Sequence, residues 1–264
     1  MNKELSFALY SIKKNIQSSA ELRTSFLMNV VGMALNNVSF IILWGYFVKS
    51  VGPIGGWTVA DIVGLQGFTA LCFGIVFSVG AGIRKLPEYT ASGAFDRFML
   101  SPKNLLVRVA TSSLGVSGFG DITFGIVCLV IYAALLHSSA FQALLMLLLV
   151  IISTVVFLAA MISVYSMSFY FTDADSVTRS IFEMFFTPAM FHGGAFQGAM
   201  RFIFTFAIPS LAVGTLPVEI VRDVSLGKLL LVSVIAVIWM FVSLKIFNRA
   251  IKKYESSNFM TFGS

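Results

Sequence analysis

The sequence predicts an all-α integral membrane protein with six transmembrane helices in one domain over residues 1–264. Three observations carry this prediction: the composition, the length of the apolar runs and the placement of basic residues. The chain is 58% hydrophobic and only 11% charged, with a mean hydropathy of +0.91. Soluble domains carry roughly 25% charged residues, so this chain could not cover a large core with a solvated surface. A water-soluble globular fold is therefore excluded.

Six stretches of the chain are long and apolar enough to cross a bilayer, which takes about 20 mostly apolar residues. They are residues 26–48, 61–83, 114–136, 141–163, 178–195 and 226–248. These runs are too long for strands and lack strict alternation, so a sheet is not expected.

Basic residues gather on one side of this six-span arrangement. Fourteen of the 18 lysines and arginines fall on that side, and five or seven spans would split them. By the positive-inside rule, that side and both termini are cytoplasmic. The net charge of +6 then reflects orientation and anionic headgroups, with no nucleic-acid partner. The four basic residues on the outer side are Lys49, Arg201, Arg222 and Lys228.

The N-terminal segment, residues 1–23, is predicted to be an amphipathic helix on the membrane surface. Apolar residues recur at helical spacing over 3–20, with lysines on the opposite side. Charged residues interrupt any continuous apolar core, so a signal peptide is not expected. A short cytosolic helix that contacts nothing is the alternative. The apolar positions are Leu5, Leu9, Ile12 and Ile16.

The longest cytoplasmic segment, residues 84–113, is too short to hold a folded enzyme domain. The chain also contains no GxxxxGK[ST] phosphate-binding motif. After Gly93, a short run with Phe95 and Phe98 is stopped at Pro102. This pattern predicts two turns of helix outside the bilayer, with exposed aromatic side chains that fit a pocket on another protein. An interfacial helix resting on lipid headgroups is the alternative.

A moderately apolar stretch, residues 197–222, follows the fifth predicted span and is broken by Pro209 and Pro217. Non-helical backbone at membrane depth is tolerated only where protein or water surrounds it. We therefore expect a hairpin that enters from outside and returns to the same side. A kinked seventh span is the alternative, but it would reverse the direction of the last span.

Polar residues within the predicted spans are few. Asn36, Asn37 and Gln66 are candidates for a translocation path, although a hydrogen-bonded link between two helices is the favoured role of the two asparagines in the first span. Asp121 lies near the start of the third span, as expected of an acid at a helix N-terminus. Arg179 and Glu183 have the spacing of an ion pair within a helix.

A metal site is not expected, because His137 and His192 are the only histidines and lie far apart in the sequence. No grouping of serine, histidine and acidic residues indicates an enzyme that acts on lipids. An ion-coupled secondary transporter usually has an acidic residue at mid-membrane and an internal repeat, and the sequence shows neither. That class and a non-catalytic membrane scaffold remain alternatives.

The cytoplasmic pattern G-x-F-D-x-x-x-L-x-P resembles the loop between the second and third spans of ABC-2 type permeases. It is most similar to the bacterial six-span branch, whose members are encoded beside a separate ATPase. The residues that match are Gly93, Phe95, Asp96, Leu100 and Pro102.

The stretch from Phe196 to Pro217 is similar to the segment that follows the fifth span in the same permeases, with Pro209 between them. Many of those proteins have a proline after the phenylalanine, where this chain has Gln197. The resemblance extends over nearly the whole chain in topology.

The resemblance implies the permease subunit of an ATP-binding cassette exporter in a bacterial plasma membrane, moving a hydrophobic or amphipathic substrate. It further implies no cofactor on this chain, because ATP and magnesium bind a partner ATPase dimer. A second permease would complete a homodimer or heterodimer. Residues 3–20 would be an interface helix, and Phe196, Pro209 and Pro217 would form an outer gate. Coupling to the ATPase would fall to Gly93, Phe95, Asp96, Arg97, Phe98, Leu100 and Pro102.

Overall fold

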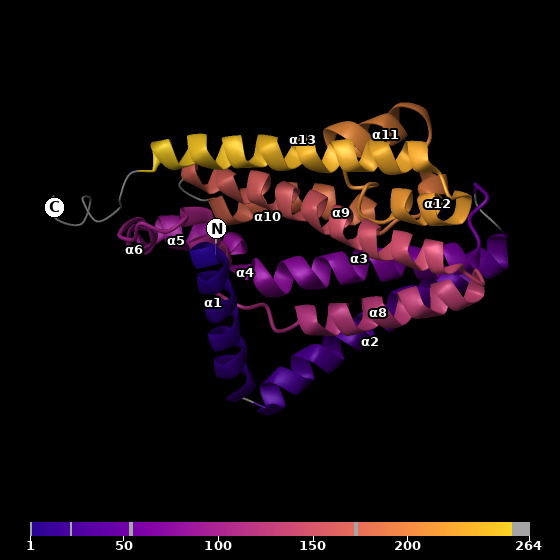
Figure 1. Cartoon of the computed structure of the whole chain (residues 1–264), viewed down its shortest axis with the longest axis horizontal. Coiled ribbons are helices and arrows are strands. Elements are labelled where there is room, and N and C mark those ends of the chain that lie inside the picture. Colours follow the sequence, from indigo (N-terminus) through magenta and orange to yellow (C-terminus); the bar gives the residue numbers. More distant parts are fainter. Residues whose placement is uncertain (1, 22, 53–54, 172–173, 255–264) are drawn as a thin grey trace.

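The computed structural model describes residues 2–21, 23–52, 55–171 and 174–254, and every regular element in these ranges is helical. Residues 1 and 22 of the predicted surface helix lie outside the described residues, as do residues 255–264. The long helices run side by side along one axis, and short helices gather at both ends of the bundle (Figure 1).

Five helices in the described ranges are long and apolar enough to cross a membrane. They correspond to five of the six predicted spans, with shifts of a few residues at their ends. Helix α9 continues into a short 3₁₀ turn, η1 (Ser166–Phe169). The five helices are α2 (Arg23–Val51), α3 (Val59–Val79), α8 (Gly118–Leu135), α9 (Ala140–Tyr165) and α13 (Leu226–Ala250).

The remaining predicted span, residues 178–195, corresponds to the shorter helix α10 (Ala174–Ala189), which has 16 residues. Beyond α10, the chain continues to Phe191, whose ring lies 5.4 Å from that of Trp44 near the far end of α2. The segment from α10 to Phe191 therefore runs from one end of the bundle to the other (Figure 1).

Helix α3 forms the centre of the bundle, because 15 of its 21 residues are buried. Its first turn is closed by a capping box between Thr58 and Asp61. Glycines on α3 let α8 approach closely, because a Cβ atom at Gly74 would lie 2.6 Å from the carbonyl oxygen of Gly118. Most of the other long helices pack around this one.

The elements that the sequence predicts to be cytoplasmic, α1 and the 84–113 segment, gather at one end of the bundle. Helix α1 (Asn2–Glu21) lies across that end, close to the short helices of the 84–113 segment (Figure 1). Asn15 Nδ2 donates to the carbonyl oxygen of Thr111 at 2.9 Å, and Lys103 lies 4.6 Å from the ring of Phe7. The predicted N-terminal helix is thus present and is not the isolated lead-in of the alternative. The short helices are α4 (Ala81–Arg84), α5 (Leu86–Ala91), α6 (Asp96–Met99) and α7 (Leu105–Ala110).

The segment between α10 and α13 doubles back on itself. Helix α11 (Gly198–Phe202) continues into a π-helical turn, η3 (Ile203–Ala207), and the chain returns through α12 (Thr215–Asp223). The turn between the two limbs reaches mid-bundle, since Ser153 Oγ in the middle of α9 donates to the carbonyl oxygen of Ala212 at 3.1 Å. The chain on either side of this segment approaches the residues before α3, since a Cβ atom at Gly55 would lie 2.7 Å from the Cα atom of Gly194, and Arg222 donates to the carbonyl oxygen of Gly56 at 3.4 Å.

Candidate functional site

The 93–102 segment is anchored by its aromatic residues. Phe95 is fully buried and Phe98 is 6% exposed. The ring of Phe95 lies 5.0 Å from that of Phe169 in η1 and 4.9 Å from that of Tyr254. The prediction that these aromatic side chains are exposed is therefore wrong. They pack into the chain's own core, because η1 and the end of α13 supply apolar surface at this position.

Two apolar side chains of this segment remain exposed: Leu100 at 87% and Met99 at 52%. The predicted two turns of helix shorten to the single turn of α6, between Gly93 and Pro102. Arg108 fixes the segment, since its guanidinium donates to the carbonyl oxygen of Phe98. The result is a tip whose aromatic residues face inward and whose residues Met99 and Leu100 face outward.

The residues predicted to form an outer gate all belong to the doubled-back segment. Phe196 is half-buried, and its ring lies 5.2 Å from that of Phe204 in an edge-on arrangement. Pro209 is buried at the start of the turn between the limbs. Pro217 is buried in the first turn of α12, where the absence of an N–H group costs no helical hydrogen bond.

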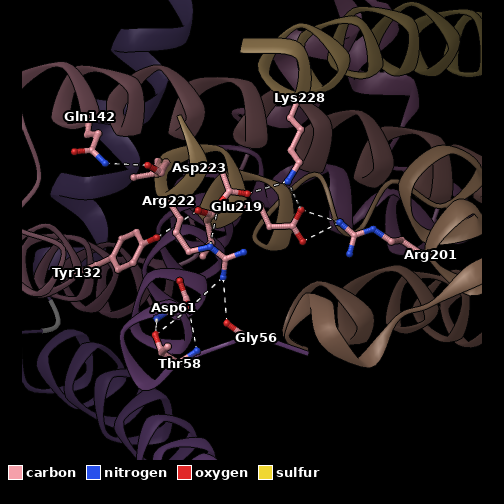
Figure 2. A network of polar contacts seen from close by, with 12 residues as sticks. Gly56, Thr58, Asp61, Tyr132, Gln142, Arg201, Glu219, Arg222, Asp223 and Lys228 are labelled. Atoms are coloured by element: carbon pink, nitrogen blue, oxygen red, sulfur yellow. Dashed lines mark hydrogen bonds and ion pairs between the residues drawn. The ribbon is translucent and has the colours of Figure 1, made fainter. Parts of the chain in front are cut away.

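A buried carboxylate joins the two limbs of this segment to α13 (Figure 2). Glu219 on α12 has a side chain only 6% exposed. One guanidinium nitrogen of Arg201, on α11, lies 2.8 Å from both of its carboxylate oxygens. Lys228 Nζ, on α13, lies 3.1 Å from Oε2. Two cations thus compensate one buried charge, as burial of a carboxylate requires.

A second cluster fixes the end of α12 to α3 (Figure 2). Arg222 lies 3.4 Å from Oδ2 of the buried Asp61 and 3.1 Å from Oδ1 of Asp223. Partial burial opposes charge on Arg222, but the hydrogen bonds and charges of Asp223 and Asp61 prevail and raise its pKa. Burial likewise opposes charge on Asp223, but Arg222 and Lys228 hold its pKa below the ordinary range.

Sequence reasoning missed this outer network. It noted Arg201, Arg222 and Lys228 only as exceptions to the sidedness of basic residues. Three acids balance them in the structure, so the network is neutral. The available signal was the presence of Glu219 and Asp223 in the same short stretch as the three cations.

Helix α10 carries polar side chains on its exposed face. Its buried face is formed by residues at helical spacing from Ala174 to Ala189. The opposite face exposes Ser176, Ser180, Glu183 and Thr187, which recur at intervals of three or four residues. The same helix also exposes Met184, and α2 exposes Asn29, Asn36 and Ser39. The predicted pair of Arg179 and Glu183 is not formed, because Arg179 lies 2.9 Å from Asp175.

The candidate path residues separate into two groups. Asn36 is exposed on α2, whereas Asn37 and Gln66 are buried. Asn37 Nδ2 donates to Oδ1 of Asp121, in the first turn of α8, at 2.5 Å. Asn37 therefore joins α2 to α8, which was the alternative considered for the asparagine pair.

A family model described as ABC-2 family transporter protein matches residues 34–258, which is well over half of the chain. No curated protein and no solved structure matches.

Proposed function

Because the chain belongs to the ABC-2 family of transporter proteins, we propose that it is the permease subunit of an ATP-driven exporter. It is a multi-pass membrane protein, and hydrolysis of ATP with its magnesium ion falls to a separate ATPase dimer. Two permease subunits, identical or different, complete the machine in a bacterial plasma membrane. The substrate is hydrophobic or amphipathic.

In this proposal α10 is the sixth membrane-crossing element and lines the path. The polar stripe of Ser176, Ser180, Glu183 and Thr187 is the observation that carries the proposal. An ionisable side chain directed into lipid is costly, so a face bearing Glu183 belongs against water or another subunit. Asn36, exposed on α2, is a second candidate for the same path.

Coupling to the ATPase uses the tip at Met99 and Leu100, with Arg97 beside it. Gly93, Phe95, Asp96, Phe98 and Pro102 shape and hold this tip. The buried rings make it move together with η1 and α13, so a push from the ATPase reaches the long helices. Both termini and this tip lie in the cytoplasm, as the distribution of basic residues favours.

The segment 197–222 acts as the outer gate, entering the membrane from outside and returning. Phe196 lies directly before this segment, Pro209 lies at the turn between its limbs, and Pro217 lies in its second limb. The exposed limb, α11, has no buried residue of its own, so it is the part best suited to move.

The path is tested by labelling with a membrane-impermeant maleimide in closed vesicles. The two native cysteines, Cys72 and Cys128, are buried and free, so their background labelling is low. We expect Ser180→Cys to react and Val237→Cys on the apolar face of α13 to remain unlabelled, although Val237 is 70% exposed in the isolated chain. Equal protection of both positions would contradict the assignment of α10 to a water-accessible path.

Coupling is tested by co-purification of the ATPase with the tagged permease. Leu100→Ser should remove the ATPase while leaving the permease inserted. Leu226→Ser is the matched control, since Leu226 is 65% exposed at the opposite end of the bundle. Retention of the ATPase by the Leu100 variant, or its loss in both, would refute the proposed tip.

A further inference from the structure

A cavity of about 320 Å³ opens at the end of the bundle where α1 and the short helices gather. Its walls come from the end of α3, helix α4, the segment before α8, the end of α9 and the start of α10. Phe77, Ser113, Ser117 and Tyr165 are among its lining residues. It thus lies where the apolar bundle meets the polar end.

Three cations line this cavity: Arg84 at the end of α4, Lys85 directly after it, and Arg179 on α10. Two acids, Glu88 and Asp175, also line it, and Asp175 is paired with Arg179 at 2.9 Å. The lining therefore carries one net positive charge.

Arg84 and Lys85 form no ion pair with any carboxylate in the described part of the chain. The guanidinium of Arg84 lies over the ring of Phe77, 4.7 Å from its centre, which holds it at the cavity wall. Guanidinium and ammonium groups without a partner are the usual donors to phosphate and other oxyanions.

The cavity also lies at the foot of the polar stripe on α10. Arg179 and Asp175, in the first turns of α10, line the cavity; Ser180 follows Arg179 directly, and Glu183 lies one turn further along the same helix. A molecule whose charged end occupied the cavity would have an apolar wall and a polar stripe beside the rest of its length.

We propose that this cavity binds the anionic headgroup, of phosphate type, of an amphiphile entering from the cytoplasmic side. The inference rests on the proposed export function and names its substrate class. The same chemistry has two sources, a transported amphiphile or a resident lipid of the inner leaflet. Arg84 and Lys85 contact the headgroup, and Arg179 restricts the mouth of the cavity.

The test measures binding to the purified full-length permease in neutral detergent. The probe is lysophosphatidic acid, and monoacylglycerol with the same acyl chain is the uncharged comparison. Arg84→Gln with Lys85→Gln should weaken binding of lysophosphatidic acid about tenfold or more, as expected for the loss of charge-assisted hydrogen bonds. Lys252→Gln with Lys253→Gln removes the same charge from exposed positions at the same end and should leave binding unchanged.

A second variant, Ser113→Trp, fills the cavity without changing its charge and should also abolish binding. Equal weakening by the two glutamine pairs, or equal affinity for monoacylglycerol, would overturn the inference. Either result would show that the probe responds only to overall charge or to its acyl chain.

The source of the headgroup is separated in vesicles that contain the complete transporter with its ATPase. ATP-dependent movement of labelled lysophosphatidic acid to the opposite leaflet, lost in the Arg84 and Lys85 variant, identifies a substrate. Binding without movement, with ATP hydrolysis altered by the lipid, identifies a resident lipid. If the permease binds lysophosphatidic acid no better than monoacylglycerol but the complete transporter still moves another molecule, this inference alone is wrong. Specific binding with no ATP-dependent transport of any amphiphile defeats the export function instead.

Discussion

Arg201 on α11 holds Glu219 on α12, with one guanidinium nitrogen 2.8 Å from both carboxylate oxygens. Because α11 buries no residue of its own, this ion pair is a principal attachment of the exposed limb to the rest of the protein. Lys228 on α13 contacts the same carboxylate at 3.1 Å. Both limbs of the outer hairpin and α13 thus share one buried charge.

A double-mutant cycle on Arg201 and Glu219 measures this attachment. We expect Arg201→Gln and Glu219→Gln each to lower the stability of the purified permease, with a coupling free energy of roughly 1–3 kcal/mol. This figure lies below that of a fully buried pair because Arg201 is 38% exposed and is screened by solvent. Thermal unfolding followed by circular dichroism supplies the measurement.

The control for this cycle is the pair of Arg179 and Asp175, which is the same type of ion pair at 2.9 Å but with side chains 69% and 60% exposed. Its coupling should be below about 1 kcal/mol. Similar coupling in the two cycles would mean that burial of Glu219 contributes nothing to the attachment of α11.

Asp223 makes part of the outer network dependent on pH. Although burial opposes it, Arg222 and Lys228 hold the pKa of this carboxyl group below its ordinary value. Its stabilising effect is therefore complete above the pKa of the unfolded chain, about 4, and is lost as pH falls through the lowered folded value. Asp223→Asn should lower the unfolding temperature at pH 7 and have no effect near pH 2. A difference that is unchanged by acid would rule out this charge effect.

Asn37 and Asp121 give a prediction within the bundle. Asp121 is buried, accepts one hydrogen bond from Asn37, and has its second oxygen without a partner in the described structure. Asn37→Leu should cost about 1–3 kcal/mol because it removes the donor that the described residues supply to this buried carboxylate. Replacing both residues by leucine should recover most of that loss, as measured by thermal unfolding. Additive losses in the double variant would show that the pair is not coupled.

The long helices could be predicted from sequence because hydropathy over about 20 residues is a local property. The limits of α10 could not be predicted as well. The helix starts earlier than predicted, at Ala174, because polar residues such as Asp175 continue it past the apolar run. It ends earlier too, at Ala189, just after Pro188. A prediction based on local hydropathy misses both the earlier start and the earlier end of the helix.

The candidate site was only partly predictable for a different reason. The segment from Gly93 to Pro102 was found from its own pattern. Burial of Phe95 depends on Phe169 and Tyr254, which are far away in sequence and meet it only in the fold. The attachment of Glu219 to two cations on two other helices is likewise a tertiary property.

Burial of Phe95 predicts that this residue contributes to the stability of the permease itself. Phe95→Ala should destabilise the permease by about 3–5 kcal/mol, because it leaves a cavity in a well-packed core. Phe202→Ala is the control, since Phe202 is 64% exposed and should lose little. Thermal unfolding of the permease without its ATPase checks both. A Phe95 variant as stable as the Phe202 variant would contradict the anchoring role.

Val224 ends α12 in a left-handed conformation, with φ of 47° and ψ of 47°. A β-branched residue pays roughly 1–2 kcal/mol for this conformation, and glycine is the usual residue there. Val224 is 42% exposed, so little apolar contact is lost on its replacement. Val224→Gly should therefore stabilise the protein by about 1 kcal/mol.

The matched control is Val242→Gly, because Val242 is 38% exposed but lies within α13. There the substitution should destabilise by about 1 kcal/mol or less. If both variants are destabilised in thermal unfolding, the strain assigned to Val224 is absent.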